Sequence, residues 1–229
     1  MNKTLTFSDY LNKTFVTLGA GLAISTIIAL LVSNNIYYIL YALGGFGTFL
    51  MLGVIVGELG VAIYFSRRLP SMSKSTAWAC YIVYAILTGL SLSTIFAVYD
   101  LGSIVFALAS TCILFVCMSI IGSTTKIDFS NYRSLFATGL ITMIIMSLLN
   151  GLLFHLYFID LIMMYLGVIT FLGLIAYDIQ KLRDIYSSSF TNSEMGEKMM
   201  IYGAFELYLD FINLFIRILQ IFGRRRNDR

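Results

Sequence analysis

The sequence predicts an all-α membrane protein, a bundle of seven transmembrane helices, and three observations support this. Hydrophobic residues make up 59% of the 229 residues and charged residues only 12%, and the mean hydropathy is +0.88. A soluble domain is nearer half apolar and a quarter charged. The apolar residues form about seven long runs joined by short polar links, and a bilayer crossing needs roughly 20 apolar residues. We therefore expect residues 1–229 to form a single seven-helix transmembrane domain.

The predicted spans follow one another with few residues between them. In chain order they are residues 14–33, 36–66, 76–98, 102–122, 133–154, 158–186 and 198–222. The first run is too long for the apolar core of a cleaved signal peptide, and no small-residue cleavage site follows it, so we expect it to stay in the mature protein. In the second span, Gly53 and Gly57 have the four-residue spacing that lets two helix backbones approach closely.

Basic residues predict the orientation of the spans, because short cytoplasmic loops retain Lys and Arg. Lys and Arg occur before the first span and after the second, fourth and sixth, whereas the links near Asn34, Asp100 and His155 contain none. The N-terminus is therefore predicted to be cytoplasmic. Seven full crossings would place the basic residues 224–226 outside, against the same rule. Either the last segment is re-entrant, or the tail is an exception.

Composition also argues against several classes of protein. The net charge of +3 is small and dispersed, which gives no support for nucleic-acid binding. Cys80, Cys112 and Cys117 lie within apolar spans and lack the spacing of metal ligands. His155 is the only histidine, so neither a zinc hydrolase nor a Ser/His protease is supported. We predict that the protein is not an enzyme and has no cofactor.

Two aspartates inside the predicted spans form the most specific pattern, because a charge at the bilayer centre costs about 2.5 kcal/mol or more. Asp178 and Asp210 lie equally far from residue 194, which is in the polar link between their spans. In an antiparallel hairpin they would lie at similar depth and face each other. Two carboxyls in a low-dielectric site cannot both ionise cheaply, so the pair would hold one proton and sense pH. The alternative is a static polar lock that fixes the helix register.

Polar side chains also form a stripe along the last span, at spacings of four, three and four residues: Glu206, Asp210, Asn213 and Arg217. This spacing places them on one helical face, which we expect to line the bundle interior. Such a stripe is typical of an ion pathway. Carboxylate oxygens suit a hard cation such as calcium. We predict calcium binding at Asp178 and Asp210.

Two further features of the second span bear on this pathway. Glu58 adds a carboxylate within the span, so it is predicted to line the ion pathway together with Glu206 and Asn213. Arg67 and Arg68 follow the span, where the ordinary interpretation is a positive-inside anchor. The more specific interpretation is that one of these arginines reaches Asp178 and latches the bundle closed.

Three stretches resemble the Bax-inhibitor family, the transmembrane Bax inhibitor motif proteins, and specifically its bacterial members. They are GLIAYDIQK at 173–181, ELYLDFINLFIRILQIFG at 206–223 and GLSLSTIF at 89–96, and the seven-span layout matches over essentially the whole chain. The resemblance implies a pH-sensitive calcium leak in the bacterial inner membrane, with the last helix at the centre of the bundle. It maps the family's aspartate pair onto Asp178 and Asp210. The family's intramembrane glutamate resembles Glu58, and its latching arginine maps to Arg67 or Arg68.

Two other functions stay open. The protein could be a non-transporting regulator that binds another membrane protein, because some bacterial relatives are associated with a membrane-bound protease. It could also be an intramembrane aspartyl protease, since paired carboxyls suit acid/base work on a peptide bond. Against the protease, Asp210 follows Tyr208-Leu209 rather than Gly-x-Gly, and Pro70 is the only proline. The expected partners are the lipid bilayer and calcium.

Overall fold

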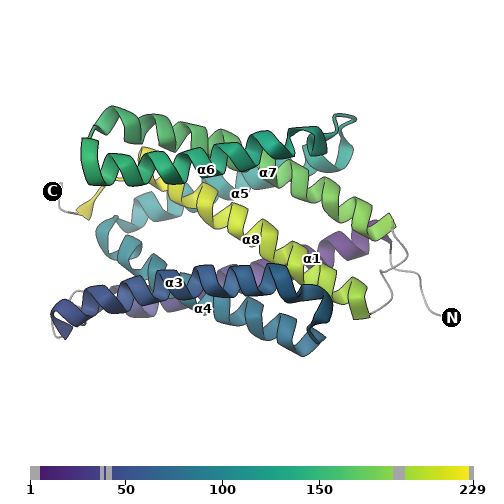
Figure 1. Cartoon of the computed structure of the whole chain (residues 1–229), viewed down its shortest axis with the longest axis horizontal. Helices are drawn as coiled ribbons and strands as arrows, with labels where there is room; N and C mark the ends of the chain where they lie inside the picture. The colour runs from purple at the N-terminus through teal and green to yellow at the C-terminus, as the bar shows by residue number, and fades with distance from the viewer. Residues whose placement is uncertain (1–5, 37–38, 40–42, 188–193, 227–229) are drawn as a thin grey trace. The chain divides into compact units, whose positions relative to one another are not determined.

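A computed structural model describes residues 6–36, 39, 43–187 and 194–226 of the chain (Figure 1). In these residues, seven helical segments are long and apolar enough to cross a membrane. The α-helices are α1 (Phe7–Ser33), α3 (Gly45–Arg68), α4 (Lys74–Val98), α5 (Leu101–Thr124), α6 (Arg133–Leu149), α7 (Tyr157–Ser187) and α8 (Glu194–Phe222). Three short elements adjoin these helices. A 3-10 turn at Leu69–Ser71 follows α3, and a second 3-10 turn at Phe129–Tyr132 precedes α6. A π-helix at Asn150–Phe154 extends α6. The predicted seven-helix, all-α fold is confirmed.

Two helix starts differ from the prediction more than the others do, for local reasons. Helix α1 begins at Phe7 because Thr6 and Asp9 form a capping box, in which the Asp9 amide donates to the Thr6 hydroxyl at 3.2 Å. The second predicted span, residues 36–66, begins earlier than α3, the helix that carries most of it. Gly44 has φ of +54° and α3 begins only at Gly45. Glycine adopts this conformation without the steric cost that a Cβ would bring.

The chain divides into two compact units. Unit 1 comprises Met1–Asp100, Ile185–Tyr208 and Arg225–Arg229, and unit 2 comprises Leu101–Asp184 and Leu209–Arg224. Helix α8 therefore contributes its first half to unit 1 and its second half to unit 2. More of its apolar stretch is buried, 56%, than in any of the other candidate spans. The central position of this helix and the single-domain organisation stay predictions.

Unit 1 has an aromatic core shared by α3, α4 and the first half of α8. The Tyr84 ring packs edge-on against Phe205, with centroids 4.9 Å apart, and against Tyr208 at 5.8 Å. Phe65 of α3 lies 5.0 Å from the same Phe205. Helices α1 and α4 approach closely at Gly89, where a Cβ would come within 2.8 Å of the Ser25 carbonyl oxygen. These contacts fix α8 and α1 against α4.

In unit 2, helix α5 packs against both α7 and the second half of α8. At Gly122 of α5, a Cβ would lie 2.6 Å from the Ala176 carbonyl oxygen of α7, so only glycine permits this approach. Two turns earlier on α5, the Phe115 ring packs against Phe211 of α8 with centroids 5.6 Å apart. The helices that carry Asp178 and Asp210 therefore share α5 as a neighbour.

The α6–α7 hairpin of unit 2 is held by Asn150. The Asn150 side chain accepts from the Leu156 amide at 2.9 Å and donates to the Leu156 carbonyl at 3.1 Å and to Asp160 Oδ1 at 2.7 Å. His155 ends the π-helix in the left-handed region, with φ of 51°. The single histidine therefore lies in a turn rather than in a ligand set.

The close helix approach predicted at Gly53 and Gly57 is not found among the described residues. A Cβ at Gly53 would have no described atom within 4 Å, and one at Gly57 would meet only the Leu87 side chain, at 3.5 Å. Close approaches to a neighbouring backbone occur instead at Gly89 and Gly122. Spacing alone did not indicate which glycines face a neighbouring helix.

Candidate functional site

Both predicted pH-sensing carboxylates lie in unit 2 and are buried. Asp178 of α7 is 8% exposed and Asp210 of α8 is 6% exposed. Asp178 lies on the same buried face of α7 as Ile175 and Leu182. Buried carboxylates on spanning helices are costly and are retained for a reason. That the two carboxyls face each other stays a prediction.

Ser119 of α5 is a third polar residue of this region, and the sequence did not single it out. It lies between Phe115 and Gly122 at helical spacing, and these two residues contact α8 and α7 respectively. Ser119 is 6% exposed, and its hydroxyl has no hydrogen-bond partner among the described residues. A lone serine in an apolar span carries no signal of its own. Only the packing of α5 shows that Ser119 shares a face with the contacts to both aspartate-bearing helices.

The link between α5 and α6 is fixed to α7 just beyond Asp178. Gln180 donates to the Ile127 carbonyl at 2.7 Å and accepts from the Phe129 amide at 2.8 Å. Between these two residues, hydrogen bonds from the hydroxyl and the amide of Ser130 hold the pKa of the exposed Asp128 carboxyl below its ordinary value. The YDIQ stretch thus supplies a buried aspartate and, two residues later, the side chain that orders the adjoining link.

Glu58 belongs to unit 1 and lies in a separate polar cluster. Its half-buried side chain on α3 lies next to the hydroxyls of Thr88 and Ser91 on α4. One Glu58 carboxyl oxygen and both hydroxyl oxygens are buried, and the two hydroxyls lie beside the carboxylate. Oxygen atoms of this kind are the ligands that hard cations prefer. The cluster could therefore contribute to an ion pathway, as predicted for Glu58.

A hydrogen-bonded chain connects α1, α4 and α8 near this cluster. The Ser25 hydroxyl lies 2.7 Å from the Ala85 carbonyl oxygen and 2.5 Å from the Tyr208 hydroxyl. Tyr208 also lies next to Thr88. This network could not be predicted from the sequence, because tyrosine and serine are ordinary residues of an apolar span and their partners are far apart in the chain.

The remaining residues of the α8 stripe are divided between the units. Glu206 is half-buried in unit 1. In unit 2, Asn213 donates to the Leu209 carbonyl of its own helix at 2.8 Å. Arg217 packs so closely on Gly167 of α7 that a Cβ there would lie 3.0 Å from its Nε, and it donates to Gln220 at 3.2 Å. The ion-pathway roles of Glu206 and Asn213 stay predictions.

The predicted latch and calcium site also stay predictions. Arg67 and Arg68 are exposed at the end of α3 in unit 1, whereas Asp178 belongs to unit 2. Over the described residues, no group of three or more His, Cys, Asp or Glu side chains is placed to hold a metal ion. Calcium takes six to eight oxygen ligands, so Asp178 and Asp210 could supply only part of such a set.

Comparison with known proteins places the chain in a family. Residues 7–227 match the family described as "Inhibitor of apoptosis-promoting Bax1". The chain is 35% identical over 223 residues to an uncharacterised protein of Borreliella burgdorferi, covering 96% of this chain and 94% of that protein. An uncharacterised protein of Rickettsia prowazekii is 35% identical over 232 residues, covering 99% and 95% of the two chains.

A further relative is named for its location. The inner membrane protein YbhL of Escherichia coli is 39% identical over 179 residues, covering 77% of this chain and 75% of that protein. These matches run through the candidate membrane spans described above. The chain is therefore an integral membrane protein, and it belongs to the Bax inhibitor-1 family.

Proposed function

We propose that this protein is a passive cation leak, with calcium preferred, whose open fraction is set by the protonation of Asp178 and Asp210. The observation that carries the proposal is the burial of both carboxylates on spanning helices of one compact unit. Two nearby buried carboxyls share a proton, and the pair packs differently when that proton leaves. A pair of this kind responds to pH without any soluble sensor domain.

The Glu58 cluster supports a cation rather than an anion as the transported ion. Its carboxyl oxygen and the hydroxyls of Thr88 and Ser91 offer oxygen atoms from two helices of unit 1. In the proposed mechanism Glu58, Glu206 and Asn213 line the pathway, and Arg67 or Arg68 latches the closed state by pairing with Asp178. The bacterial inner membrane is the proposed location, with the N-terminus in the cytoplasm.

Calcium flux into proteoliposomes tests the proposal. Purified wild-type protein should pass calcium with a rate that changes about tenfold between roughly pH 5 and 8, which corresponds to about 1.4 kcal/mol in the gating equilibrium. Asp178→Asn and Asp210→Asn should each flatten this change to less than about twofold. Asp160→Asn is the matched control, because Asp160 lies on the same helix but bonds Asn150 in the hairpin.

Two results would overturn the mechanism. One is a protein that passes no calcium at any pH in this range. The other is a pH response that persists unchanged in both asparagine variants. The first result would favour the alternative, a non-transporting regulator of a membrane protein such as a membrane-bound protease. The open face of α3 at Gly53 suits such a partner, which should then be retained through gentle detergent purification after both aspartates are neutralised.

A further inference from the structure

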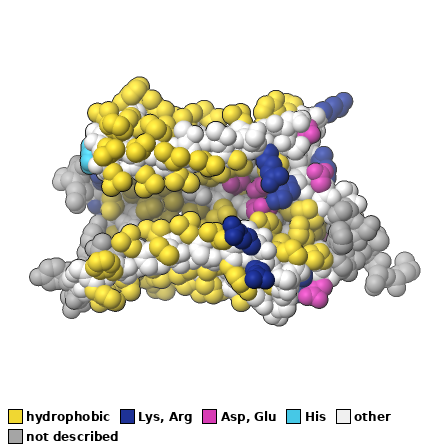
Figure 2. Space-filling view, in the orientation of Figure 1, with side chains coloured by type: hydrophobic (Ala, Val, Ile, Leu, Met, Phe, Trp, Pro, Cys, Tyr) yellow, Lys and Arg dark blue, Asp and Glu magenta, His cyan; other side chains and the backbone are white. Residues whose placement is uncertain are grey.

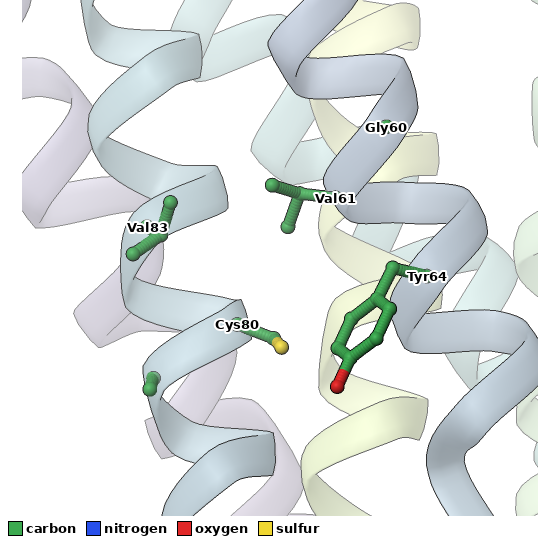
Figure 3. Close-up of a pocket in the computed structure, with 6 residues that line it drawn as sticks. Gly60, Val61, Tyr64, Cys80 and Val83 are labelled. Carbon is green, nitrogen blue, oxygen red and sulfur yellow. The ribbon is translucent and has the colours of Figure 1, made fainter.

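An apolar groove lies between α3 and α4 of unit 1 (Figure 3). Its volume is about 260 Å³, and six residues line it: Gly60, Val61, Tyr64, Ala79, Cys80 and Val83. Figure 3 shows the Tyr64 ring and the Cys80 thiol in the space between the two helices. Gly60 keeps one side of the groove open, because a Cβ there would have no described atom within 4 Å.

The groove opens on a surface that suits lipid acyl chains. Its neighbours on α3, Leu59 and Ile63, are 59% and 54% exposed, and Val83 in its lining is 45% exposed. Exposed apolar side chains of a spanning helix contact acyl chains. The groove lies close to one end of both helices, because Tyr64 is four residues before the end of α3 and Ala79 is five residues after the start of α4. It therefore faces the leaflet on the side of the Leu69–Ser71 turn.

Two cations lie beyond the groove on the same face of α3. Arg67 and Arg68 follow Tyr64 by three and four residues, which places them above it on the helix surface. Both are exposed, and in the described part of the chain neither forms an ion pair. Figure 2 shows basic side chains over this part of unit 1, on a surface that is otherwise largely hydrophobic.

The other two cations near this turn are already engaged. Lys74 forms an ion pair with Glu197 of α8. Lys198 is buried and donates to the Met72 carbonyl at 2.9 Å and to the Pro70 carbonyl at 3.4 Å. The positive charge available to a ligand at this end of the groove therefore comes from Arg67 and Arg68.

We propose that the groove binds an acyl chain of an anionic phospholipid, whose headgroup phosphate is held by Arg67 and Arg68. The guanidinium fork matches phosphate oxygens in geometry and charge. Arg67 follows Gly60 by seven positions, a rise of about 10 Å along the helix. The headgroup layer of one leaflet is roughly 5 to 8 Å thick, so one lipid can reach both parts of the site. This site lies wholly within unit 1. An arginine that holds the phosphate cannot pair with Asp178 at the same time, so the lipid would compete with the proposed latch, but the lipid test below does not require the leak.

Trp78 is the only tryptophan, but its ring packs against Tyr81 rather than in the groove, so Trp78→Phe combined with Val83→Trp moves the fluorophore into the groove lining. This parent protein is placed in phosphatidylcholine nanodiscs, and phosphatidylglycerol or phosphatidylcholine with brominated acyl chains is added to quench its tryptophan fluorescence. Brominated phosphatidylglycerol should quench at a lower mole fraction than brominated phosphatidylcholine. The preference should be about fivefold for each arginine, since a basic residue near a membrane surface contributes about 1 kcal/mol.

The headgroup assignment is tested by Arg67→Gln combined with Arg68→Gln. In this double variant the two brominated lipids should quench at the same mole fraction, and a preference for phosphatidylglycerol that persists would overturn the assignment. Gly60→Leu should fill the groove and weaken quenching by both lipids at least threefold relative to Gly53→Leu, a matched change at an equally open glycine outside the groove. If Gly60→Leu and Gly53→Leu behave alike, the proposal is wrong. It is also wrong if neither lipid quenches the groove tryptophan of the parent protein. Arg67 and Arg68 are exposed, so their substitution should not prevent folding. The double arginine variant therefore tests the proposal even if Gly60→Leu does not fold.

Discussion

The two compact units bury polar groups in different ways. In unit 1 the Ser25 hydroxyl bonds the Ala85 carbonyl and the Tyr208 hydroxyl, and the buried Lys198 ammonium bonds the Met72 carbonyl. The carboxylate of Glu58 in the same unit is only half-buried. In unit 2 the buried polar groups include two carboxyls, Asp178 and Asp210. Hydrogen bonds from hydroxyl groups stabilise the packing of helices and do not change charge with pH, whereas a buried carboxyl gains or loses its charge as the pH changes. The proposed proton sensing therefore rests on the carboxyl pair of unit 2, whereas the hydroxyl network of unit 1 is expected to stabilise the packing of its helices.

Both units use the same packing device, a glycine against a neighbouring helix backbone, and this device should show the largest effects on stability. Gly122→Ala in unit 2 and Gly89→Ala in unit 1 should each lower the free energy of unfolding by about 1 to 3 kcal/mol. Gly122→Ala should be the worse, because its Cβ would come within 2.6 Å of a carbonyl oxygen rather than 2.8 Å. Thermal unfolding in detergent measures both. Gly53→Ala, at an open position, should be neutral or stabilising, and a loss equal to that of Gly122→Ala would contradict the packing argument.

The hydroxyl network of unit 1 should have the next largest effect. Ser25→Ala leaves the Tyr208 hydroxyl buried without its 2.5 Å partner, which should cost about 1 to 2 kcal/mol of unfolding free energy. Tyr208→Phe should cost a similar amount. The double variant should be less destabilised than the sum of the two, with a coupling of about 1 kcal/mol in a thermal-unfolding cycle. Strict additivity would show that the two hydroxyls do not stabilise each other.

Glu58 offers a test of whether the two units differ in function. Glu58→Gln should lower calcium flux severalfold at every pH, because it removes a negative ligand from the pathway, and should leave the shape of the pH profile unchanged. Asp178→Asn should do the reverse. Glu197→Gln, which removes an exposed carboxylate of unit 1 that pairs with Lys74, is the control. A Glu58→Gln profile that flattens like that of Asp178→Asn would show that proton sensing is not confined to unit 2.

Ser119 should produce the smallest change. Ser119→Ala removes a buried hydroxyl from the α5 face that contacts both aspartate-bearing helices, so it should move the midpoint of the flux profile by about 0.3 pH unit, or about 0.4 kcal/mol. Ser123→Ala is the matched control, because Ser123 is only partly buried and its hydroxyl donates a hydrogen bond to the Ile120 carbonyl of its own helix at 2.9 Å. If both variants have the same midpoint, the Ser119 hydroxyl does not contribute to the proposed pH response.

The sequence by itself determined the membrane class, the number of spans and the residues that needed a functional reason. Hydropathy over about 20 residues is a local property, so α4, α5 and α7 begin and end within two residues of the predicted spans. The burial of Asp178 and Asp210 also followed from sequence, because apolar runs surround both residues.

Tertiary structure alone decided which side chains meet. The break at Gly44, the close approaches at Gly89 and Gly122, the bond from Ser25 to Tyr208 and the place of Ser119 all depend on how each helix is rotated toward its neighbours. An all-apolar helix has almost no difference in hydropathy between its faces. The periodicity of its sequence therefore does not show which face packs against the neighbouring helices. Only packing against specific neighbours selects it.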